Sequence, residues 1–185
     1  MASFLNCTLF TFILLIPTFI GNSDGAFSEE LSENILMNRM EKTTHLHFYL
    51  HDIVSGNDPS AVRIAGTSDT TGFGATFIMD DALTEGPNPT SRLIGRAQGL
   101  YSLAAQHDTA LLMVVNYAFI GGKYNGSSIS ILGRNPVLND AREMPIVGGC
   151  GLFRLARGYA VAHSISFDRK MGDATVEYNV YVQHY

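Results

Sequence analysis

The feature that most constrains this fold is a two-residue alternation that begins at Thr44. In Thr44–Asp52 (THLHFYLHD) one set of alternate residues is histidine or tyrosine, and the other set is mostly apolar. Alternate residues of a β-strand share a face, so this segment is predicted to be a strand with one apolar face. Asp52 ends the apolar set, which places its carboxylate either in water at the strand end or at the mouth of an apolar cavity.

Seven further segments have strand character and are separated by clusters of Gly, Pro, Asn and Asp. The short connections and the lack of a long helical pattern indicate antiparallel pairing. Closure into a barrel removes exposed sheet edges, and glycines inside strands often mark barrel corners. We therefore expect an all-β fold and favour an eight-stranded antiparallel β-barrel over a sandwich. The predicted strands are Thr44–Asp52, Ala61–Ala65, Phe73–Asp80, Arg92–Leu103, Ala110–Ile120, Ser127–Gly133, Gly151–Ile165 and Ala174–His184.

The chain divides into three predicted parts. Residues 1–26 are interpreted as a secretory signal peptide, because Leu9–Ile20 is apolar and uncharged but too short to span a bilayer of ~30 Å as a helix. A buried N-terminal helix is the alternative. Residues 27–43 form a polar leader, and residues 44–185 form the barrel domain. Cys150 is the only cysteine outside the signal, so the domain has no internal disulfide, and its glycine neighbours favour a buried, unreactive thiol.

Charge and composition restrict the partners. The net charge is -5 and the basic residues are scattered, so the sequence has no nucleic-acid footprint. We expect no membrane association either. Asn125-Gly126-Ser127 is an N-glycosylation sequon, which operates only in a secreted protein. We therefore expect an extracellular glycoprotein that carries its glycan on Asn125.

Candidate metal and cofactor sites are weak. His45, His47 and His51 share one strand face, and three histidines can hold zinc, but no acid or cysteine cluster supports them. An exposed polar face is the preferred interpretation. No phosphate-binding loop, nucleophile motif or redox-cofactor motif is present, so we expect no cofactor and no metal. Asp80 and Asp81 are adjacent and face opposite sides of a strand, and one of them is expected to cap a turn.

Five motifs follow one another in a specific order: FYLHDI at 48–53, FIMDDALT at 77–84, GRAQGLY at 95–101, Arg142 followed by PIVGGCG at 145–151, and FRLARGYA at 153–160. Together they resemble the motifs of the plant dirigent proteins, and within that family the sequence is most similar to the broader dirigent-like subgroup. The resemblance covers residues 44–185. It implies a barrel of the allene-oxide-cyclase/dirigent type, usually assembled as a trimer, with a dimer as the alternative, and an apolar pocket in each protomer.

The resemblance also implies a role in phenylpropanoid or lignan-type biosynthesis in the apoplast of the cell wall. Dirigent proteins bind phenolic radicals or quinone methides and fix the face on which they couple or cyclise. A separate oxidase, such as a laccase, supplies the radicals. Two alternatives stay open: a dehydrating cyclase of the pterocarpan-synthase kind, and a phenolic carrier without catalytic activity.

The pocket residues of the family are only partly present. Asp52 and Arg142 match the family and are expected to be catalytic. A second family aspartate is replaced by Asn135, and a tyrosine by Leu103. The expected substrate-binding residues are Phe48, Tyr101, Leu103 and Asn135.

Physical chemistry gives Asp52 and Arg142 complementary roles. A carboxyl in an apolar pocket has a raised pKa, so Asp52 could protonate a quinone methide oxygen or a departing hydroxyl. The Arg142 guanidinium would stabilise a developing oxyanion. Its alternative role is a structural salt bridge in a loop rich in turn residues.

Overall fold

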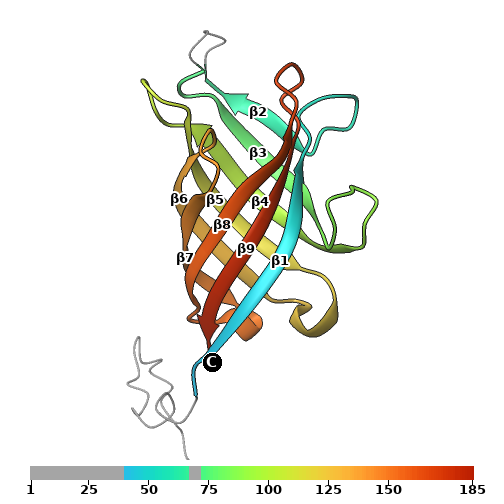
Figure 1. Cartoon of the computed structure of the whole chain (residues 1–185), viewed down its shortest axis with the longest axis vertical. Coiled ribbons are helices and arrows are strands. Elements are labelled where there is room, and N and C mark those ends of the chain that lie inside the picture. The colour runs from blue at the N-terminus through green and yellow to red at the C-terminus, as the bar shows by residue number, and fades with distance from the viewer. Residues whose placement is uncertain (1–39, 67–71) are drawn as a thin grey trace, which may run out of the picture.

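The computed structural model describes residues 40–66 and 72–185, which form nine strands and two short 3-10 helices (Figure 1). No helix in these residues is long and apolar enough to cross a membrane. The elements are β1 (Lys42–Asp52), β2 (Ala61–Ala65), β3 (Thr76–Thr84), β4 (Leu93–Leu103), β5 (Ala110–Phe119), η1 (Gly122–Tyr124), β6 (Ser128–Pro136), β7 (Arg142–Cys150), η2 (Gly151–Phe153), β8 (Arg157–Phe167) and β9 (Ala174–His184).

Eight strands close the barrel, and β2 lies outside the ring. The sheet order is β1-β9-β8-β7-β6-β5-β4-β3-β2, and an additional antiparallel pairing of β1 with β3 closes it. Leu50 lies opposite Leu83 at this seam. β2 pairs with the other half of β3, where Ala61 lies opposite Met79. The predicted eight-stranded antiparallel barrel is therefore confirmed.

The largest differences from the prediction concern three strands, one of which, β7, was not predicted at all. β3 starts and ends later than the predicted 73–80, and the predicted strand at 151–165 begins only at Arg157, after η2. β7 is a strand where the sequence suggested a turn-rich loop: Gly148 and Gly149 pair regularly with β6, Pro145 lies opposite Tyr159 of β8, and the bulge in the β6 pairing falls at Val147. Gly149 is needed in β7, since a Cβ there would lie 2.6 Å from the carbonyl oxygen of Phe153. Cys150 is exposed, so its predicted burial is wrong.

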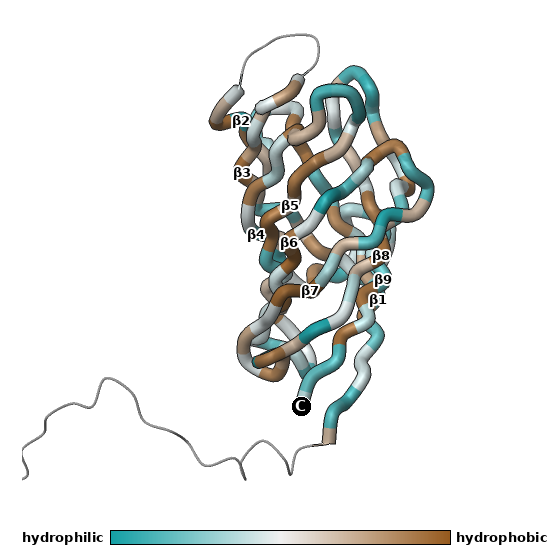
Figure 2. Tube along the Cα trace, turned by 90° about the vertical axis from the view of Figure 1, so that its left-hand side faces the viewer, coloured by the Kyte–Doolittle hydropathy of each residue, from teal (hydrophilic) through white to brown (hydrophobic). Residues whose placement is uncertain are grey.

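The barrel interior is packed at one end and hollow at the other. We call the end that holds the β8–β9 hairpin the upper end, as drawn in Figure 1. At the lower end the fully buried Phe153 of η2 stacks on Tyr124 with ring centroids 5.0 Å apart and meets the His184 ring at 5.1 Å. Figure 2 shows hydrophobic positions along the strands and hydrophilic loops at the upper end. Aromatic residues thus close the lower end, and any cavity has to open upward.

Candidate functional site

A cavity of about 550 Å³ occupies the upper half of the barrel. This volume is typical of sites for small organic molecules. Inward-facing side chains from all eight barrel strands line it, among them Met79, Met113 and Val176 as apolar walls. A wider hollow of about 780 Å³ lies beside the β8–β9 hairpin, but it is open and holds none of the buried acids. The cavity inside the barrel is therefore the candidate site.

The cavity brings together five of the six residues expected at the site: Asp52, Tyr101, Leu103, Asn135 and Arg142. Phe48 does not line it. Its fully buried ring packs below the floor, stacked on the ring of Tyr178 with centroids 5.8 Å apart. The predicted residues therefore form one site, and Phe48 supports its floor rather than contacting its contents.

Asp52 lies at the upper end of β1 and points into the cavity. Burial raises the pKa of its carboxyl to about 6, and the negative charge of Asp173 adds to that rise. The Tyr101 hydroxyl opposes it by donating a long hydrogen bond of 3.4 Å to Oδ1. The sequence left two positions open for the Asp52 carboxylate, in water at the strand end or at the mouth of an apolar cavity, and the structure shows the second. A carboxyl with this pKa can hold and release a proton near neutral pH.

Asp81 is a second buried acid that the sequence reasoning missed. It is fully buried on β3, and the pairing of Leu50 with Leu83 shows that Asp52 and Asp81 lie on the same inner face of the seam. The Ser60 hydroxyl donates to its Oδ1 at 2.5 Å, and its Oδ2 is buried without a hydrogen-bond partner. Burial first, and the charge of Asp52 second, raise the pKa of Asp81 to about 8. Asp81 therefore stays protonated at neutral pH.

The signal for Asp81 was present in the sequence. Phe77, Met79, Asp81 and Leu83 alternate on one face of β3, the same pattern that identified Asp52 on β1. The predicted strand ended at Asp80, which left Asp81 outside it. Both aspartates lie inside β3, so the expected turn cap is wrong. Asp80 faces outward and accepts a hydrogen bond of 2.8 Å from Nε of Arg96.

Arg142 is buried on β7 beside Asn135 of β6, and both side chains line the cavity. Its Nη1 donates to the Ser164 hydroxyl at 2.8 Å, and its Nε has no hydrogen-bond partner. Within the described part of the chain no carboxylate lies within ion-pairing distance, so the structural salt bridge is not formed there. Burial lowers the pKa of Arg142, yet a guanidinium stays charged at neutral pH. The site thus holds a buried cation suited to an oxygen that gains negative charge.

The three histidines of β1 have separate environments. His45 and His47 lie on the outer face, where they hydrogen-bond to β9 side chains at 2.9 and 2.6 Å. His51 is buried, 2.8 Å from the Thr84 hydroxyl, so the prediction of an exposed histidine face is wrong for this residue. In residues 40–66 and 72–185 no group of three or more His, Cys, Asp or Glu side chains is arranged to hold a metal ion.

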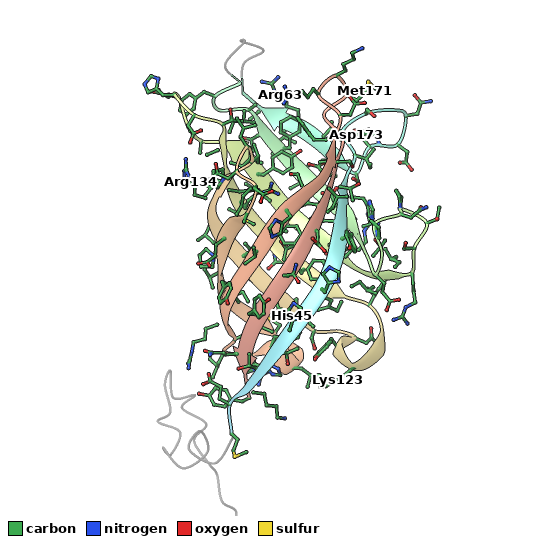
Figure 3. The ribbon with its side chains drawn as sticks, in the orientation of Figure 1. His45, Arg63, Lys123, Arg134, Met171 and Asp173 are labelled. Carbon is green, nitrogen blue, oxygen red and sulfur yellow. The ribbon has the colours of Figure 1, made fainter. Side chains whose placement is uncertain are left out.

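Asp173 fixes the mouth of the cavity. Figure 3 labels it at the upper end of the barrel, at the base of the β8–β9 hairpin. Its carboxylate accepts hydrogen bonds from the backbone N–H groups of Val54 and Ser55, at 2.9 and 3.0 Å, and from the Ser55 hydroxyl at 2.6 Å. These bonds join the hairpin to the segment that follows β1. They therefore hold the chain next to Asp52.

Comparisons with known proteins agree with this architecture. The family model described as "Dirigent-like protein" matches residues 43–183. Dirigent protein 7 of Arabidopsis thaliana is 49% identical over 177 residues, covering 95% of each chain, and pterocarpan synthase 1 of Glycine max is 48% identical over 166 residues, covering 87% of this chain and 89% of that one. A solved structure of a pterocarpan synthase dirigent protein superposes with a TM-score of 0.76 at 49% identity, over 80% of this chain and 87% of the other. The chain therefore belongs to the dirigent family.

Proposed function

We propose that this protein binds a phenolic quinone methide, or a phenoxy radical made by a separate oxidase, inside its barrel and fixes the face on which the new bond forms. The observation that carries the proposal is the Asp52 carboxyl, held in an apolar cavity with a pKa of about 6 and opening onto the same cavity as the buried Arg142. The similarity to two proteins named pterocarpan synthases supports cyclisation as the leading reaction.

In the cyclisation, protonated Asp52 gives its proton to a departing benzylic hydroxyl. The carbon–oxygen bond breaks, water leaves, and the ring hydroxyl para to that carbon releases its proton to solvent, so the remaining molecule is a neutral quinone methide. A second hydroxyl of the same molecule then adds to the benzylic carbon and its proton returns to the Asp52 carboxylate, while the ring oxygen takes a proton back from solvent. The net change is the loss of one water, and Asp52 ends as it began, so no oxidant is consumed.

Arg142 and the cavity walls complete this scheme. The guanidinium stabilises negative charge on a ring oxygen as the bonding electrons shift, and it does so in a setting with little water, where such charges interact strongly. The apolar walls determine which face of the planar quinone methide meets the second hydroxyl. A difference of about 1.4 kcal/mol between the two barriers gives about tenfold selectivity.

Radical coupling in lignan-type phenylpropanoid biosynthesis is the second candidate. It uses the same cavity for orientation, and the carboxyl and guanidinium groups then act only as hydrogen-bonding groups. Relatives whose names state no reaction, such as Dirigent protein 21 of Arabidopsis thaliana, leave this chemistry as a proposal for the present chain. Binding without any reaction would make the protein a carrier of phenolics.

One experiment separates these functions. The purified protein is given an isoflavanol-type substrate with a free second hydroxyl and no oxidant, and in parallel a phenylpropenol with a laccase. Chiral chromatography then identifies the products. Enantioenriched dehydrated product in the first reaction supports the cyclase, and enantioenriched coupled product in the second supports radical coupling. Racemic products in both, from a series of phenolics, contradict the proposal and leave only the carrier.

We also propose that the protein is secreted to the apoplast and carries a glycan. The exposed Asn125 follows η1 directly, so the side chain that would carry the glycan is accessible. The predicted signal peptide and most of the leader lie outside the described residues. Secretion from a plant host, followed by N-terminal sequencing and glycosidase treatment, tests both halves. A retained Met1, or a mass that the glycosidase leaves unchanged, contradicts the corresponding half.

The outer surface supports a homo-oligomer, with a trimer proposed first and a dimer second. The register of β3–β6 places four apolar side chains in one row across the outer face, next to a row of polar ones. The ends of this row are among the exposed large hydrophobic residues, and the hydrophobic stretches of β4, β5 and β6 are visible in Figure 2. Such a patch marks a protein interface more often than open surface. The apolar row consists of Ile78, Leu100, Val114 and Leu132.

A further inference from the structure

Two phenol side chains lie at and below the floor of the cavity. Tyr178 of β9 is the lowest residue of its strand to line the cavity, and Tyr117 of β5 lies beside it, almost completely buried. Their rings meet edge to face with centroids 5.4 Å apart. Phe48 packs against both rings, at 5.8 Å from Tyr178 and 5.2 Å from Tyr117. Two phenylalanines would fill this space without the free-energy cost of burying two hydroxyl groups. Packing alone therefore does not explain why these residues are tyrosines.

The two hydroxyl groups interact through a hydrogen bond. A pair of hydroxyls bonded to each other uses one of its two protons, and only Tyr178 lines the cavity, so the arrangement in which Tyr117 donates is the one that places the remaining proton at the cavity rather than in the packed half. Tyr117 therefore uses its proton on Tyr178, and the proton of Tyr178 has to go elsewhere. In the part of the chain that the structure describes, no protein acceptor is recorded for that proton.

The polar surroundings of Tyr178 lie on the side of the cavity. The positive charge of Arg142 and the negative charges of Asp81 and Asp52 all act on the pKa of its hydroxyl, so this group faces the same polar interior as they do. Among them Arg142 and Asp52 line the cavity together with Tyr178, whereas Asp81 is not part of its lining. A donor without an acceptor at the floor of a ligand cavity is a binding group for a ligand oxygen.

We infer that Tyr178 binds the substrate directly, by donating its hydroxyl proton to a ring oxygen at the deep end of the phenolic, and that Tyr117 positions it. This inference rests on the proposed function, in which the benzylic centre lies near Asp52. The oxygen held by Tyr178 is the one para to that centre, which becomes the carbonyl oxygen of the quinone methide. The substrate class is then narrower than phenolics in general: it requires an oxygen para to the reacting carbon.

Two polar anchors and a shaped wall are enough to fix a planar molecule in one orientation. Asp52 and Tyr101 hold the reacting end, and Tyr178 with Arg142 holds the opposite oxygen. A molecule that lacks the para oxygen keeps the first anchor and loses the second. It should therefore bind more weakly and, if it reacts, with less facial selectivity.

A matched pair of inert ligands tests this inference without any turnover. Isoflavanone is compared with its analogue that carries one hydroxyl para to the carbonyl carbon, and calorimetric titration gives both affinities. The unaltered protein should bind the hydroxylated analogue about tenfold more tightly. Tyr178→Phe should abolish this preference and leave the affinity for plain isoflavanone within twofold. Tyr117→Phe should reduce the preference by two- to threefold, because Tyr178 keeps its proton but loses its orientation.

Controls separate the inference from the function on which it rests. Tyr159→Phe, on the exposed outer face of β8, should change neither affinity. Binding of both ligands with the same ratio in Tyr178→Phe as in the unaltered protein overturns the role of Tyr178 alone. Binding of neither ligand to the unaltered protein overturns the proposed function and this inference with it. If Tyr178→Phe does not fold, as judged by circular dichroism, an unchanged ratio in Tyr117→Phe overturns the inference.

Discussion

The carboxyl groups of Asp52 and Asp81 face the barrel interior from the two strands that close it, β1 and β3. Burial raises both pKa values, to about 6 for Asp52 and about 8 for Asp81. Only Asp52 lines the cavity. Two acids whose environments separate their pKa values can take different roles. Near pH 6 Asp52 exchanges its proton, while Asp81 stays neutral and adds no negative charge beside it.

Asp52→Asn should leave the fold intact and reduce the rate of dehydrative cyclisation by more than a hundredfold, because an amide cannot supply the proton that the departing hydroxyl needs. Asn135→Ala removes a hydrogen-bonding group from the same cavity and should cost less than tenfold. Initial rates with an isoflavanol-type substrate measure both effects. Equal rates in the two variants and the unaltered protein contradict the assignment of the cavity as the reaction site.

The pH dependence of the same reaction should follow the protonation of Asp52. The rate should fall about tenfold per pH unit above about pH 6, since only the protonated form donates. Asp173→Asn removes a charge that raises the pKa of Asp52 and should move this limb to lower pH, while an asparagine at 173 can still accept the backbone hydrogen bonds. Asp168→Asn in the same hairpin is the control. If the fall in rate begins at the same pH in Asp173→Asn as in the unaltered protein, Asp52 is not the proton donor.

Asp81 should make the protein less stable as the pH rises. Its pKa is about 8 in the folded state against 3.8 for an ordinary aspartate, so its contribution to stability is complete below about pH 4 and is lost as the pH rises toward 8. The loss is at most about 1.4 kcal/mol per pH unit in that window. Urea unfolding of the unaltered protein and of Asp81→Asn, at pH 5 and pH 8, measures the difference.

His51 titrates in the same range with the opposite sign, because burial lowers its pKa. It is present in both proteins, so the comparison between them isolates Asp81. Asp80→Asn, on the outer face, is the matched control: its pKa is lowered rather than raised, and its removal should not flatten the decline. If the free energy of unfolding falls between pH 5 and pH 8 by the same amount in Asp81→Asn as in the unaltered protein, position 81 does not hold a buried, neutral carboxyl.

Val114→Glu should convert the proposed oligomer to a monomer, because it places a charge in the middle of the apolar row on the outer face of β5. Light scattering at micromolar concentration measures the molar mass of the unaltered protein and the variant. Ile165→Glu changes an exposed apolar residue of β8 outside that row and should leave the mass unchanged. A monomeric unaltered protein contradicts the oligomer itself.

The protein alone should consume no oxygen when mixed with a phenol, because the proposed chemistry removes water and transfers no electrons. Added to a laccase, it should change the enantiomeric ratio of the products while oxygen uptake stays the same. An oxygen electrode and chiral chromatography, run in parallel, give both quantities. Heat-denatured protein controls for trace metals. Oxygen uptake by the purified protein alone would contradict the scaffold role.

The alternation of polar and apolar residues predicted the barrel because a strand shows its two faces directly in the sequence. It located Asp52 for the same reason. The limits of β3 and β7 were harder to predict, since Pro145 and the glycines of β7 carry a turn signal that pairing with β6 and β8 overrides. An error of a few residues in β3 was enough to hide Asp81.

Depth within the barrel is the other property that the sequence does not contain. Phe48 and Leu50 alternate on one face of β1, but only Leu50 reaches the cavity, because the strand crosses from the packed half to the hollow half between them. The same holds for Val180 and Tyr178 on β9. Their level depends on the register with neighbouring strands, and register comes from long-range pairing rather than from local pattern.

In the residues that the structure describes, the aromatic closure around Phe153 at the lower end leaves the chamber open toward the upper end only. Whatever enters between the β8–β9 hairpin and the loops at the upper end has to leave by the same route. Product and incoming substrate therefore compete for one passage, and a molecule that lingers after reacting blocks its successor. Exchange of product for substrate is therefore slow, but the bound molecule is isolated from solvent. This isolation suits a short-lived electrophile that would otherwise react with water.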